Sequence, residues 1–223
     1  MALHALIGAG PATIVEVGGH DGVTGSMSLY FEELGWPCLV VEPIPALAEA
    51  IRRRRTCIVV EAAADTTEGQ ADFLVPEGSE TIATLDNENT AHSRIGEHTG
   101  AVSRIQVRTR RLDDILHDAG LDRADVVSVD VEGNELNVLN GFSLSRWNPR
   151  FLILEDNSFG RDQTVRRHLQ HQGYRIMRVT GVNHWYCRAD DPALTVLERT
   201  RCQAMLLAVR IFGIVTGRGR PSG

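Results

Sequence analysis

The sequence predicts an α/β protein whose mainly parallel seven-stranded sheet carries helices on both faces. Two observations predict this class: short apolar runs of strand length alternate with helical patterns along the chain, and the first apolar run leads into a glycine-rich turn. The chain has 223 residues, a length that suits one α/β domain. We therefore expect a single domain over residues 1–223, with a C-terminal helix and tail from about residue 192.

Each expected element is an apolar run or a periodic helical pattern with a recognisable end. The apolar runs predict strands at 13–17, 38–41, 57–62, 105–109, 125–129 and 151–154, with an added hairpin strand at 71–75. Helical patterns cover 26–34, 46–54, 112–119, 134–140 and 164–172, and glycines follow several of them as stop signals. Strands at 174–179 and 185–188 would close the sheet as an antiparallel pair. The polar stretch 78–100 is expected to be a long loop or lid.

Composition excludes several classes of protein. The net charge of −6 argues against a nucleic-acid partner, whose phosphates need a basic face. The four cysteines form no C-x-x-C pair, which disfavours a zinc or redox motif. We expect no signal peptide and no transmembrane segment, because the apolar stretch 202–215 is too short to cross a bilayer. A cytoplasmic location is the expectation.

The first strand ends in the turn Glu16-Val-Gly-Gly-His-Asp-Gly22. Glycines allow a tight turn and the close approach of a ligand. A strand-to-helix corner that binds no ligand would have the same sequence pattern. Asp21 would repel a dinucleotide pyrophosphate, whereas S-adenosylmethionine has no phosphate and carries a sulfonium and an ammonium. Glu42 ends the second strand 20 residues after Gly22, where an acid accepts hydrogen bonds from ribose hydroxyls in nucleoside-binding α/β folds.

Acidic residues follow two later strands. Asp130 ends the strand at 125–129, and Glu155-Asp156-Asn157 follows the next one. Parallel neighbouring strands would bring these side chains to one edge of the sheet, where carboxylate and amide oxygens suit Mg²⁺. The competing interpretation is that Asp130 and Asp156 cap the helices that follow them.

From about residue 13 to residue 187, the chain resembles the FkbM-type methyltransferases. The matching pieces, in order, are the glycine turn 16–22, Val-Glu-Pro-Ile-Pro at 41–45, Ala-Ala-Ala-Asp at 62–65, Arg-Leu-Asp-Asp-Ile at 111–115, Val-Asp-Val-Glu-Gly-Asn-Glu at 129–135 and Leu-Asn-Gly at 139–141. The resemblance implies a Rossmann-like fold, S-adenosylmethionine and O-methylation, often of a sugar or natural-product hydroxyl. The stretch from Asp21 to Ser26 is similar to a branch that acts on saccharides. We expect a cofactor site of Glu16, Gly18, His20, Asp21, Gly22, Ser26, Glu42, Ala64 and Asp65.

A second resemblance concerns the metal. Leu-Glu-Asp-Asn at 154–157, together with Asp130, is similar to the Asp…Asp-Asn ligand set of the Mg²⁺-dependent catechol-type O-methyltransferases, which implies Asp130, Asp156 and Asn157 as ligands. With Glu155 from the same strand end, the expected metal site is Asp130, Glu155, Asp156 and Asn157. That family has a lysine shortly after its first ligand, but this chain contains no lysine. The candidates for the base that removes the acceptor proton are therefore Glu132 and His184, with Asp130 as the third catalytic residue. The alternative interpretation of residues 183–184 is a turn between the last two strands, with no catalytic role.

Two rival functions stay open. A nicotinamide or flavin oxidoreductase would use the same fold, but the chain lacks G-x-G-x-x-G. A non-catalytic binding module is the second rival, since the expected C-terminal helix offers a partner surface and is compatible with a homodimer. Our expectation is O-methylation of a sugar or oligosaccharide, with a natural-product or phenolic hydroxyl as the alternative acceptor.

Overall fold

The computed structural model describes residues 2–8, 10–87, 95, 98–158, 160–195, 200 and 204. Seven strands form the larger sheet, in the order β10-β11-β9-β8-β1-β2-β3. Their bounds are β1 Ile14–Val17, β2 Cys38–Val41, β3 Ile58–Val60, β8 Val126–Val129, β9 Phe151–Glu155, β10 Tyr174–Thr180 and β11 Asn183–Arg188. The C-terminal helix expected after residue 192 lies almost wholly outside the described residues.

The larger sheet is mixed. β1, β2, β3, β8 and β9 run parallel, and β11 pairs antiparallel with both β9 and β10. The expected antiparallel closing pair is therefore present. β11 begins at Asn183 rather than at residue 185, so the turn expected at 183–184 was wrong: both residues belong to the strand.

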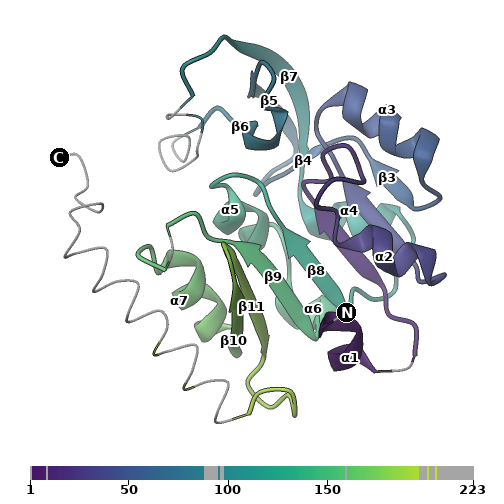
Figure 1. The fold of residues 1–223 in the computed structure, drawn as a ribbon, viewed down its shortest axis with the longest axis vertical. Coiled ribbons are helices and arrows are strands. Elements are labelled where there is room, and N and C mark those ends of the chain that lie inside the picture. Colours follow the sequence, from purple (N-terminus) through teal and green to yellow (C-terminus); the bar gives the residue numbers. More distant parts are fainter. Residues whose placement is uncertain are drawn as a thin grey trace.

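Helices cover both faces of this sheet (Figure 1). Alternate strand residues point to opposite faces, and two separate apolar clusters result. One cluster joins Val15, Val127 and Leu152 to α4 (Leu112–Asp118), α5 (Glu135–Asn140), α6 (Leu144–Trp147) and α7 (Thr164–His171). The other joins Ile14 and Phe151 to α1 (Ala2–Ile7) and α2 (Ser28–Glu33). α3 (Pro45–Arg54) follows β2 and lies beside β3.

A second sheet was not expected from the sequence. It has the order β4-β7-β5-β6, formed by β4 (Ala63–Ala64), β5 (Gly69–Pro76), β6 (Thr84–Leu85) and β7 (Val102–Arg110). The strand expected at 57–62 ends at Val60, and the chain passes into this second sheet at Ala63. The expected loop 78–100 contains the short 3-10 helix η1 (Glu80–Ile82) and β6, and its residues 88–94, 96 and 97 lie outside the described residues.

The parallel register fixes where a ligand site can form. Val17 is level with Val41 of β2 and with Val129 of β8, so three strands end side by side. The residues that follow these ends share one edge of the sheet, which is where open α/β sheets bind ligands. Within the described part of the chain, no helix combines the length and the hydrophobicity needed to cross a membrane.

Candidate functional site

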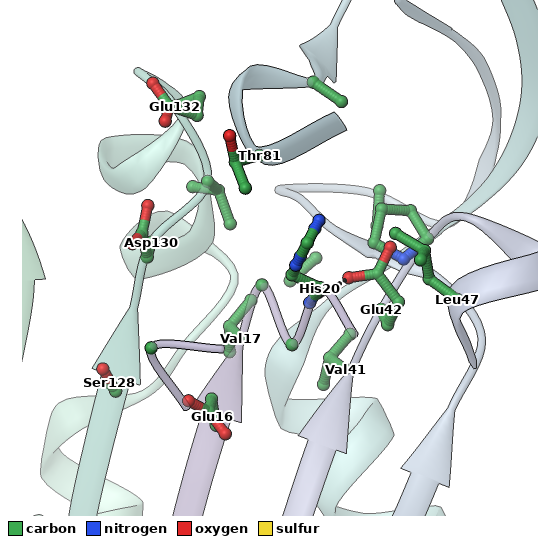
Figure 2. A pocket seen from close by; sticks show the side chains of 18 of the residues that line it. Glu16, Val17, His20, Val41, Glu42, Leu47, Thr81, Ser128, Asp130 and Glu132 are labelled. Carbon is green, nitrogen blue, oxygen red and sulfur yellow. Dashed lines mark hydrogen bonds between the residues drawn. The ribbon is translucent and has the colours of Figure 1, made fainter. Parts of the chain in front are cut away.

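A cavity of about 420 Å³ lies at this edge, between the ends of β1, β2 and β8 and the second sheet. Figure 2 shows His20, Glu42 and Leu47 at one end and Asp130 and Glu132 at the other, with Thr81 of η1 between them. The volume is in the range of small-molecule and cofactor sites. Of the residues expected to bind a cofactor, the cavity is lined by Glu16, Gly18, His20, Ser26, Glu42 and Ala64.

The glycine turn brings the backbone of β1 against that of β8. Gly18 has φ +90°, and a Cβ atom at this position would lie 1.9 Å from the carbonyl oxygen of Asp130. A residue with a side chain would therefore force the two strand ends apart. His20 follows with φ +47°, a left-handed conformation that is unusual for a residue other than glycine. Such strained residues gather at ligand sites.

Glu42 is a buried carboxylate at the end of β2, with 3% of its surface exposed. It accepts hydrogen bonds from the backbone N–H groups of His20 at 2.8 Å and Ile44 at 2.9 Å, one at each oxygen. Burial raises the pKa of Glu42 to about 7, and the backbone hydrogen bonds only partly oppose this. A carboxylate oxygen can accept more than one hydrogen bond, so this group can also accept from a diol that enters the cavity.

Glu16 lines the cavity, but its carboxylate is already engaged by the start of α2. It accepts hydrogen bonds from the Ser26 hydroxyl and the Met27 N–H, each at 2.7 Å, and from the Ser28 hydroxyl. The guanidinium of Arg55 lies 3.7 Å away. Glu16 therefore holds the chain after the glycine turn in place, and Ser26 is held with it.

Three residues expected at the cofactor site do not line the cavity: Asp21, Gly22 and Asp65. Asp21 accepts hydrogen bonds from the N–H groups of Val23 and Thr24 and from the Thr24 hydroxyl. These bonds outweigh the effect of burial and lower the pKa of Asp21 to about 2. The carboxylate thus closes its own turn rather than facing the cavity.

An acidic cluster stands where β8 and β9 end. Oxygen atoms of Asp130, Glu132 and Glu155 all lie within 4.8 Å of one another, and Glu132 and Glu155 are buried. The Asn157 side-chain nitrogen donates to Glu132 at 3.2 Å and to Glu155 at 2.7 Å. Turning this amide by 180° would present its oxygen at the same place. The donor set of carboxylate and amide oxygens fits a hard divalent cation.

Asp156 and His184 do not line the first cavity. Asp156 accepts hydrogen bonds from the N–H groups of Ser158 and Gly160, both at 2.8 Å, and from the Ser158 hydroxyl. Its second oxygen lies 3.2 Å from Nδ1 of His184, which is buried. Both residues line a second cavity of about 400 Å³ beside α5 and α7, and Glu155 and Asn157 of the acidic cluster line this cavity too. The neighbours of His184 in β11, Asn183 and Trp185, point the other way and line the first cavity.

Comparison with known proteins agrees with this geometry. The chain matches the methyltransferase FkbM domain over residues 16–176, which is more than half of its length. The chain belongs to the FkbM methyltransferase family. A stretch of 82 residues is 33% identical to methyltransferase sdnD of Sordaria araneosa, covering 33% of this chain and 32% of that protein. The chain thus spans about a third of the curated relative that it matches.

Within this FkbM domain, sequence reasoning missed two residues that build the site. Arg55 is buried and donates to the carbonyl oxygen of Gly22 at 3.1 Å, as well as to the Ser26 and Ser28 hydroxyls. In the sequence it looks like the last member of an exposed arginine run. Glu135 is buried at the start of α5; it closes the matched stretch 129–135, but an acidic residue in a first helical turn is common, and nothing in the sequence assigned it a role.

Proposed function

We propose that this FkbM methyltransferase uses S-adenosylmethionine to methylate a hydroxyl of a sugar or oligosaccharide, assisted by a divalent cation. The observation that carries the proposal is Glu42, a buried carboxylate on the wall of a cavity that continues past the glycine turn to Asp130 and Glu132 of the acidic cluster. A ribose diol is the nucleoside group that such a carboxylate accepts. Family membership supports the methyl-transfer chemistry.

The two ends of the cavity suit the two ends of this cofactor. Leu47 and Ala62–Ala64 add apolar surface near Glu42, which suits an adenine ring. Asp130 and Glu132 place negative charge at the other end, which suits a positively charged sulfonium and ammonium. When bound, S-adenosylmethionine supplies a methyl group on a sulfur that is a good leaving group. Gly18 has no side chain and so allows the cofactor to approach the turn closely. His20 and Ser26 form part of the cavity wall.

Asp130, Glu132 and Glu155 are the residues that would hold the cation, with Asn157 beside them. A divalent cation there would lower the pKa of a hydroxyl bound next to it. We assign proton acceptance to Glu132 rather than to His184, because Glu132 lines the cavity of Glu42 and His184 lines the other one. Asp156 is not carried into the ligand set, because its oxygens already contact Ser158, Gly160 and His184.

A sugar acceptor is supported by the wall beyond Asp130. Ser128, Ile153 and Trp185 are level with one another on three neighbouring strands, and all three line the cavity. An indole next to hydroxyl and amide groups, including Asn183, suits the apolar face and the polar rim of a sugar ring. A phenolic or natural-product hydroxyl is the alternative acceptor, and a panel of acceptors would separate the two.

Calorimetric titration with S-adenosylhomocysteine, with and without Mg²⁺, tests the cofactor assignment. We expect micromolar-class binding at pH 8, weakened at least tenfold by Glu42→Gln, which replaces one acceptor oxygen by a donor. Glu49→Gln is the matched control, because Glu49 is an exposed carboxylate on α3 outside the cavity. An absence of binding to the wild-type protein, or equal binding to both variants, would overturn the assignment.

A further inference from the structure

The turn between β8 and α5 has an unusual backbone. Glu132 has φ +53° and Gly133 has φ +100°, so two consecutive residues are left-handed. Glu132 is 2% exposed and is one of three residues with positive φ that are not glycine among those described. The conformation is costly for a residue with a side chain, and it persists only where surrounding contacts hold it. It directs the Glu132 carboxylate into the acidic cluster.

Glu135 supplies such contacts from below the turn. Its Oε1 accepts hydrogen bonds from the N–H groups of Val131 at 3.4 Å and Gly133 at 3.1 Å, the residues on either side of Glu132. Glu135 is itself 8% exposed and is the first residue of α5. From the opposite side, the Thr84 hydroxyl of β6 donates to the carbonyl oxygen of Glu132 at 3.1 Å. The turn is therefore held on two sides.

We propose that Glu135 is a positioning residue that sets the orientation of Asp130 and Glu132 for cation binding, an inference that rests on the function proposed above. Its carboxylate acts on the backbone and needs no contact with the cation or the acceptor. One oxygen between the two amides is sufficient for this role. Glutamine at this position keeps that oxygen, whereas leucine has a similar volume and removes it.

Glu135→Gln and Glu135→Leu, compared with wild type, test this proposal. Asp113→Leu is the matched control, because Asp113 is also a buried carboxylate that accepts two N–H groups, from Ser143 and from the Trp147 indole, both at 2.8 Å. It ties α4 to α6 and lies outside both cavities. Three readouts are taken on the full chain: calorimetric Mn²⁺ affinity, S-adenosylhomocysteine affinity, and amide hydrogen exchange at Val131 and Gly133.

We expect Glu135→Leu to weaken Mn²⁺ binding at least tenfold and to speed exchange of both amides, because partners behind metal ligands contribute on that scale. Glu135→Gln should restore both to near the wild-type values. Asp113→Leu should lower stability and leave Mn²⁺ affinity within twofold. S-adenosylhomocysteine affinity should fall less than Mn²⁺ affinity in Glu135→Leu, because Glu42 at the other end of the cavity keeps its contacts.

Two results would overturn the inference while leaving the proposed function intact. One is unchanged Mn²⁺ affinity in Glu135→Leu. The other is equal loss in Glu135→Leu and Asp113→Leu, which would mean general destabilisation. If the wild-type protein binds S-adenosylhomocysteine but no Mn²⁺, then cation assistance fails and this inference fails with it. If it binds Mn²⁺ but no S-adenosylhomocysteine, then the cofactor assignment alone fails.

Discussion

The backbone N–H of His20 donates a hydrogen bond to the carboxylate of Glu42, joining the turn after β1 to the end of β2 at 2.8 Å. His20 has φ +47°. The turn after β8 is held in a similar way, because Glu135 accepts hydrogen bonds from the backbone on both sides of the left-handed Glu132. Each strained turn on the cavity wall is thus held by a buried carboxylate. Burial raises the pKa of both carboxyls to about 7. Ionisation of either carboxyl therefore lowers the stability of the folded protein.

The raised pKa of Glu42 predicts a specific pH dependence of stability. The folded protein keeps a proton on Glu42 up to about pH 7, whereas the unfolded chain releases it near the ordinary value of 4.5. The stability contributed by this proton is complete below pH 4.5 and is lost as the pH rises through 7. Between pH 5 and 8 the unfolding free energy of the wild type should fall by about 2.5 kcal/mol more than that of Glu42→Gln.

Urea denaturation of the ligand-free protein at several pH values measures this difference. The slope that remains in Glu42→Gln should have the same sign, because Glu135 has a similarly raised pKa. Parallel curves for the wild type and Glu42→Gln would contradict the prediction. Glu49→Gln serves again as the control, since its exposed carboxylate should leave the wild-type slope unchanged.

Arg55→Met should destabilise the protein by about 3–5 kcal/mol and weaken S-adenosylhomocysteine binding. The side chain of Arg55 is 1% exposed and lies 2.7 Å from the carboxylate of Glu32 and 3.7 Å from that of the buried Glu16, so its removal leaves both acids without this cation. It also removes the hydrogen bond to Gly22 in the glycine turn.

Chemical denaturation of Arg53→Met provides the comparison. Arg53 belongs to the same sequence run as Arg55, but its side chain is 65% exposed and pairs with Glu49 on the same helix. That variant should lose no more than about 0.5 kcal/mol. Similar losses in the two variants would show that the buried network does not carry the effect.

Particular residues show how far the sequence could be interpreted. Glu42 was predictable because its position depends on two local signals, a strand end and a fixed spacing from the glycine turn. β1, β2 and β8 were predictable for the same reason, since their apolar runs are short and end in charged or glycine residues. Such signals depend only on neighbours in the chain.

Other features depend on contacts between distant segments. β11 begins two residues earlier than expected, which makes His184 a buried strand residue instead of a turn residue. Alternation along the strand then turns it away from the cavity that Asn183 and Trp185 line. Asp156 follows β9 as expected, but hydrogen bonds within its own loop turn it from Glu155. The second sheet pairs β5 with β7 across the segment between them, and the sequence carries no local mark of that pairing.

Gly18→Ala should abolish cofactor binding and destabilise the protein far more than Gly35→Ala. Both glycines have positive φ, +90° and +79°, so both variants incur the strain of a left-handed alanine, about 1–2 kcal/mol. Only at Gly18 would the new Cβ atom meet a backbone atom, the carbonyl oxygen of Asp130, whereas nothing lies within 4 Å at Gly35. Thermal unfolding and S-adenosylhomocysteine titration of the two variants isolate the clash. Equal losses would refute a close approach of β1 and β8.

Asp130→Asn should remove divalent-cation binding, whereas Asp156→Asn should retain it within about threefold. Asp130 belongs to the cluster whose oxygens lie within 4.8 Å, and losing one of its three charges weakens attraction for the ion. Asp156 is bound instead to Ser158, Gly160 and His184, so its substitution should loosen the loop after β9 and lower thermal stability. Mn²⁺ titration with unfolding temperature as the second readout separates these effects. The reverse ranking of Mn²⁺ affinity would return Asp156 to the ligand set and would require the loop after β9 to rearrange when the ion binds.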